Sequence, residues 1–121
     1  MSYWTPLQTA RARQQDQAKL AAVHRTDIAR AASEHAVQGS RLSHLEQARD
    51  TLQEMNQKLK LYLVKGENAA LILINDEIKI TDAKLRELSK KIETAQRKID
   101  EIDADAVILE KSIAALEAAG L

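Results

Sequence analysis

The stretch that decides the fold runs from residue 71 to residue 116 and reads LILINDEIKITDAKLRELSKKIETAQRKIDEIDADAVILEKSIAAL. Apolar or small side chains recur in it at alternating intervals of three and four residues, which is the a and d spacing of a heptad repeat. The positions of this seam are Leu71, Ile74, Ile78, Thr81, Leu85, Leu88, Ile92, Ala95, Ile99, Ile102, Ala106, Leu109, Ile113 and Leu116. The pattern predicts a long helix that packs against another helix along one face.

The composition of the 121-residue chain also favours helices. It contains three Gly, one Pro, one Trp, two Tyr and no Phe. Helix-on-helix packing can be built from Ala, Leu and Ile alone, whereas a compact core of this size normally uses several aromatic side chains. We therefore predict a single all-α domain spanning residues 1–121.

Charge and cysteine content narrow the expected function classes. The chain has 18 basic and 18 acidic residues, and this zero net charge removes the usual electrostatic case for binding nucleic acid or an anionic membrane. It has no Cys, so neither a disulfide framework nor thiol chemistry is expected. The sequence begins without a basic and apolar leader, and it lacks an apolar run of about 18 residues. These features predict a cytoplasmic protein without a membrane segment.

The first helix is predicted to cover residues 5–64. Thr5 as N-cap, Pro6 at the first helical position and Gln8 at the reach-back position form a capping box. Gly39 and Ser40 mark a kink or a break at residues 39–42, because Ser43 and Glu46 form a second capping box that is able to start a separate helix.

A bend is predicted at residues 65–67, where Gly66 is able to end one helix in the left-handed conformation. The second helix then covers residues 67–119 and ends before Gly120. Leucine and isoleucine also alternate in strand fashion across residues 59–75, so a short β-hairpin between the helices is an alternative there.

An antiparallel hairpin aligns the two helices so that facing residue numbers have a constant sum. A sum of 130, the predicted register, makes seven apolar pairs: Leu59–Leu71, Leu52–Ile78, Leu45–Leu85, Leu42–Leu88, Ala31–Ile99, Ile28–Ile102 and Ala21–Leu109. The competing arrangement is one continuous helix in a parallel dimer, and like-charged contacts such as Glu77 with Asp82 disfavour it. The sequence thus predicts a long antiparallel coiled-coil helical hairpin that associates into a dimer as a four-helix bundle.

Apolar residues that the seam does not use predict contact surfaces, because large exposed apolar patches usually mark them. The main cluster surrounds the bend and is predicted to contact a protein partner or a second copy; its members are Leu61, Tyr62, Leu63, Val64, Ile72, Leu73 and Ile80. A secondary cluster lies nearer the termini and consists of Trp4, Leu7, Val23, Val107 and Ile108.

The chain offers little for chemistry, and no catalytic, cofactor-binding or metal site is predicted. His24 and His35 lie roughly 16 Å apart along a helix, too far to share a metal ion. The acidic residues between 100 and 105 lack the glycine turn of a calcium loop. We expect a non-enzymatic interaction and assembly protein, an adaptor, stalk or chaperone-like molecule acting through the cluster at the bend. The alternative is a nucleic-acid-associated helical dimer that uses the Arg-rich first helix.

Overall fold

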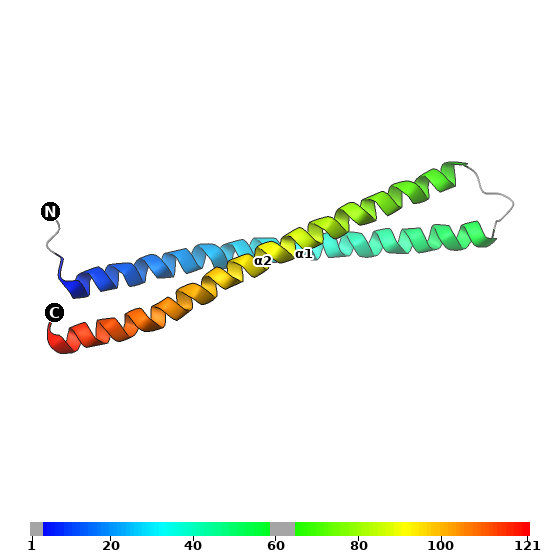
Figure 1. Cartoon of the computed structure of the whole chain (residues 1–121). Coiled ribbons are helices and arrows are strands. Elements are labelled where there is room, and N and C mark those ends of the chain that lie inside the picture. Colours follow the sequence, from blue (N-terminus) through cyan, green and yellow to red (C-terminus); the bar gives the residue numbers. More distant parts are fainter. Residues whose placement is uncertain (1–3, 59–64) are drawn as a thin grey trace. The chain divides into compact units, whose positions relative to one another are not determined.

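The computed structural model describes residues 4–58 and 65–121, and both elements within them are helices. Helix α1 covers Pro6–Lys58 and helix α2 covers Lys65–Ala119 (Figure 1). The two helices pack against each other, as the heptad pattern predicts. Residues fall into two compact units, each with a segment of both helices: unit 1 is Met1–Arg30 with Lys91–Leu121, and unit 2 is Ala31–Lys90.

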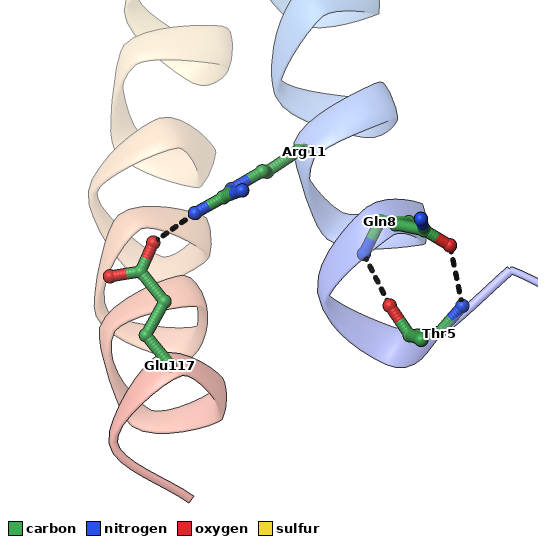
Figure 2. Close-up of polar contacts among 4 residues, drawn as sticks. All are labelled: Thr5, Gln8, Arg11 and Glu117. Atoms are coloured by element: carbon green, nitrogen blue, oxygen red, sulfur yellow. Dashed lines mark hydrogen bonds and ion pairs between the residues drawn. The ribbon is translucent and has the colours of Figure 1, made fainter. Parts of the chain in front are cut away.

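The predicted capping box begins α1. The backbone N–H of Gln8 donates to Thr5 Oγ1 at 3.1 Å, and the backbone N–H of Thr5 donates to Gln8 Oε1 at 3.0 Å (Figure 2). These two bonds satisfy donors that the first turn of a helix leaves without partners.

Gly120 ends α2 as predicted. Its φ of 71° lies in the left-handed region, which glycine adopts without steric cost. The N–H of Gly120 donates to the Glu117 carbonyl at 3.1 Å, and the N–H of Leu121 donates to the Leu116 carbonyl at 2.9 Å. This pair of bonds is a Schellman motif.

The break at residues 39–42 does not form, because α1 runs through Gly39 and Ser40 without interruption. A glycine inside a helix costs only about 1 kcal/mol relative to alanine. Leu42 and Leu45, which follow it, are half-buried, and their packing keeps this part of the chain helical.

Residues 65–67, where the bend is predicted, belong to α2, which begins at Lys65. Residues 59–64, the predicted end of the first helix, lie outside the described residues. Gly66 therefore lies in the first turn of α2, and a glycine in a helix costs only about 1 kcal/mol relative to alanine. The same helix excludes the β-hairpin alternative for residues 65–75. The remaining residues of the predicted β-hairpin, 59–64, lie outside the described residues.

The seam read from residues 71–116 is the buried face of α2. All its positions are buried or half-buried, and the most buried are Ile78, Thr81, Ala95, Ile99 and Ile113. Thr81 is only 1% exposed, and its hydroxyl donates to the Glu77 carbonyl at 2.8 Å, so this polar side chain is satisfied within the core. Helix α1 contributes a matching seam of which only Ala21 is fully buried.

In unit 1 the lining of one hollow favours a register one heptad from the prediction, whereas the Arg11–Glu117 ion pair and the hydrogen bond from Leu7 N–H to the Leu121 carbonyl fit either register. Arg13 and Gln17 of α1 line one hollow with Asp105, Leu109 and other residues of α2, so facing residue numbers add to about 123. In the predicted register Gln17 would instead face Ile113, roughly 10 Å further along α2.

Unit 2 excludes the predicted register as well. Arg41 Nη2 and Glu77 Oε2 form an ion pair at 2.9 Å. The predicted register would place Arg41 opposite Ser89, roughly 18 Å along α2 from Glu77 and beyond reach of the two side chains. The shift by one heptad places Arg41 opposite Asp82, roughly 7.5 Å from Glu77.

The charges that flank the seam are consistent with this register. A shift by one heptad keeps a and d positions aligned, so the apolar seam alone discriminates poorly. In the observed register, the facing flanking positions carry opposite charges in six pairs: Arg11–Glu117, Arg13–Asp105, Arg25–Asp103, Asp27–Lys91, Glu34–Lys84 and Arg41–Glu77. Like charges also lie near each other in the observed register, namely Glu46 near Asp82 and Arg41 near Lys84, which is two residues from Asp82. Each surface pair contributes about 0.2–1 kcal/mol, and together they favour the observed register.

Candidate interaction surface

Heptad positions divide the outer surface of each unit into two sides. The c and g positions lie beside one edge of the seam, and the e and b positions lie beside the other. The Arg41–Glu77 ion pair joins two g positions, and the Arg11–Glu117 ion pair, at 2.5 Å, joins two e positions (Figure 2). We call the surface formed by the c and g positions of both helices within one unit its c/g face.

In unit 2 most of the exposed large apolar side chains lie on the c/g face. Leu73 and Ile80 of α2 and Val37 and Met55 of α1 occupy c or g positions, whereas Ile72 occupies a b position. The sequence prediction named Ile72, Leu73 and Ile80 but missed Val37 and Met55. Leu61, Tyr62, Leu63 and Val64 from the same prediction lie outside the described residues.

Unit 1 repeats this distribution. Leu20, Val23 and Ile108 are exposed on its c/g face, and Val107 is exposed at a b position. Leu20, which the sequence prediction missed, could have been found as an apolar residue at a g position. Leu7 belongs instead to the seam, where it is half-buried and its N–H donates to the Leu121 carbonyl at 3.4 Å.

Two adjoining hollows lie on the c/g side of unit 1. One, of about 270 Å³, is lined by Arg13, Gln17, Asp105, Ile108, Leu109 and Ser112. The other, of about 470 Å³, shares Arg13, Leu109 and Ser112 with the first and is also lined by Trp4, Pro6, Thr9 and Ala10. We call the two together the unit 1 groove.

The groove arises from the sequence of α1. Its seam positions in this segment include Ala10, Gln14 and Gln17, which are small or polar, and they face Ile113, Leu109 and Ala106 in the observed register. These side chains do not fill the space beside Leu109, and Gln14 is exposed. A seam that is incomplete on one helix therefore leaves a surface depression along the other.

Two seam amides carry buried oxygens. Gln17 Oε1 in unit 1 and Gln38 Oε1 in unit 2 have no hydrogen-bond donor among the described residues. The Nε2 group of Gln38 donates to Glu34 Oε1 at 2.9 Å, so only its oxygen lacks a partner. A buried acceptor without a donor costs about 1–3 kcal/mol. Helix α1 is therefore less well satisfied than α2 in a two-helix packing.

Charges on the c/g face of unit 1 balance. Its basic residues are Arg13, Arg30, Lys91 and Lys98, and its acidic residues are Asp16, Asp27, Glu101 and Asp105. Arg13 and Asp105 both line the groove, one from each helix. The face thus combines apolar projections, a depression and equal numbers of both charges.

The described residues contain no group of three or more His, Cys, Asp and Glu side chains arranged to hold a metal ion. His24 and His35 are half-buried at seam positions. Within the described part of the chain, no helix is long and apolar enough to span a membrane. Comparison with protein-family models, with curated proteins and with solved structures found no match.

Proposed function

We infer that this chain is a non-enzymatic coiled-coil interaction and assembly protein, an adaptor, stalk or chaperone-like molecule. It forms a dimer and binds a protein partner through an apolar patch of unit 2. The described members of this partner patch are Ile72, Leu73 and Ile80, and the sequence adds Leu61, Tyr62, Leu63 and Val64. The observation that carries the proposal is the exposure of Ile72, Leu73 and Ile80, at 61%, 66% and 48% respectively.

The position of these three side chains explains why α1 leaves them uncovered. Ile72 at a b position and Leu73 at a c position lie on either side of the outermost f column of α2, and Ile80 follows Leu73 in the c column. Packing against α1 uses the a and d columns instead, so a surface for another protein remains alongside the coiled coil. The two contacts are compatible because they use different columns of the same helix.

The patch supplies part of the free energy that binding of a partner requires. Full burial of a large aliphatic side chain contributes about 1.5–3 kcal/mol. Three partly exposed side chains of this kind therefore contribute several kcal/mol before the entropic cost of association is subtracted. A partner with an apolar groove or an amphipathic helix has the complementary surface. The mechanism is geometric: the coiled coil presents the patch and no bond is made or broken.

The test begins with a photo-crosslinking residue placed at Leu73 in the full chain, which identifies the protein that contacts the patch in the source cell. The partner is then purified and its binding is titrated. The double variant Leu73→Arg/Ile80→Arg is expected to weaken binding at least about tenfold, since it places two charges in an apolar contact. The matched control is Ala83→Arg, which adds a charge at an exposed f position of α2 in the same unit. Equal binding by wild type and the double variant would refute the proposed patch.

A further inference from the structure

The c/g face of unit 1 is the second apolar surface of the chain, and it differs from the partner patch because it also contains a groove. Ile108 is 65% exposed at one wall of the groove and Trp4 is 59% exposed at the other end. We propose that a second copy of this chain packs its own unit 1 c/g face against this one, with each copy's projections seated in the other's groove. This inference rests on the dimer of the proposed function and names its interface.

The solvent-accessible area of the chain is large enough to accommodate a second copy. The chain exposes 9136 Å². A compact monomer of 13.5 kDa exposes roughly 6,500 Å². The difference, roughly 2,600 Å², belongs to the whole chain, and it exceeds the approximately 800 Å² per partner that a standard stable interface buries. A second copy is large enough to cover an interface of that size, whereas a short peptide would cover only part of it.

The charge distribution is compatible with a second copy of the chain as the occupant. A partner with a strongly acidic or basic surface would find no net attraction, because the face carries four residues of each sign. A two-fold interface brings one patch against itself and requires self-complementarity. Projections beside a depression, with both charges interspersed, satisfy this requirement.

The test uses Trp4 as a built-in reporter, since it is the single tryptophan of the chain and lines the groove. Light scattering and tryptophan emission are measured on wild type across a dilution series. The expected mass at high concentration is twice the 13.5 kDa of the chain. Trp4 emission is expected to shift to longer wavelength on dilution, in parallel with the fall in mass.

Two variants locate the interface. Ile108→Arg is expected to shift the mass to that of one chain and to abolish the dependence of Trp4 emission on concentration, with helical content unchanged by circular dichroism. Ala104→Arg is the matched control, at an exposed f position of the same helix four residues away, and it should behave as wild type.

Several results would overturn the interface. If the wild-type protein keeps the mass of one chain at all concentrations, the proposed interface is refuted. Partner binding at Leu73 would then be the part of the proposed function that remains. A dimer that survives Ile108→Arg, or one whose formation leaves Trp4 emission unchanged, places the second copy elsewhere. If Leu73→Arg dissociates the dimer while Ile108→Arg does not, the copy occupies the partner patch. The dimer of the proposed function would then survive without this interface.

Discussion

The register of the two helices makes a sharp prediction at the layer that contains Ala21 and Ile102. These residues face each other in the observed register, whereas the register read from the sequence sets Ala21 against Leu109 and Ile102 against Ile28. Ala21 is 4% exposed and Ile102 is half-buried. The exchange Ala21→Ile with Ile102→Ala keeps the side-chain volume of that layer constant in the observed register. In the predicted register it would change the side-chain volume of two different layers.

The magnitudes follow from burial. Ile102→Ala should cost about 2 kcal/mol of unfolding free energy, the low end of the range for core truncations, because the side chain is only half-buried. Ala21→Ile should also cost about 2 kcal/mol, since it adds three carbon atoms to a closed layer. A volume-conserving exchange should cost about 1 kcal/mol in total. The two changes are therefore coupled by about 3 kcal/mol, and their helix propensities cancel across the exchange.

The assay is urea unfolding followed by circular dichroism, with every variant at the same protein concentration because association contributes to stability. Ala21→Ile with Leu109→Ala serves as the control exchange, and its effects should be additive within about 0.5 kcal/mol. The reasoning is refuted if the control pair is coupled while the pair of residues 21 and 102 is additive. That result would restore the register predicted from the apolar pattern.

Four further outcomes are expected. Exchanging the charges of Arg41 and Glu77 together should restore most of the stability that each single change loses. Urea unfolding should give a coupling free energy of about 0.5 kcal/mol that disappears in 1 M salt. A coupling of zero at low salt would contradict the ion pair. Gln38→Leu should raise the unfolding free energy by about 1–2 kcal/mol, since it removes a buried acceptor without a donor, whereas Gln47→Leu at an exposed f position should change it by less than about 0.5 kcal/mol. Thr5→Ala should lower thermal stability by the equivalent of about 1 kcal/mol, because it removes the oxygen that accepts from Gln8 N–H, and an unchanged melting temperature would argue against the cap. Finally, the chain should pass through a heparin column at low salt; retention that falls steeply with added salt would favour the nucleic-acid alternative over the assembly protein.

Local sequence signals predicted the features that depend on one segment of chain. The capping box of Thr5 and Gln8, the stop at Gly120 and the buried face of α2 all depend on residues within a few turns of one another. Gly39 shows the limit of such signals. Its low helix propensity predicts a possible boundary, but packing of the half-buried Leu42 and Leu45 outweighs this small intrinsic cost.

The candidate surface was only partly visible in the sequence. Ile72, Leu73, Ile80 and Ile108 were recognised because the strong seam of α2 assigns every residue of that helix to a column. Leu20, Val37 and Met55 were missed because the seam of α1 is interrupted by Gln17, His24, His35, Gln38 and Arg49, so its columns became clear only once α2 was packed against it. The groove required both helices, since small side chains on one must lie beside large ones on the other.

The amino-acid order by itself determined that two long helices form and which face of α2 is buried, because both properties arise from hydrogen bonds and periodicity within a single helix. The tertiary structure alone decided which residues of α1 and α2 face each other. A shift of one heptad leaves apolar residues opposite apolar residues, so the seam offers two registers of similar energy. The Arg41–Glu77 ion pair is within reach in only one of these registers, and it forms only when the two helices lie together.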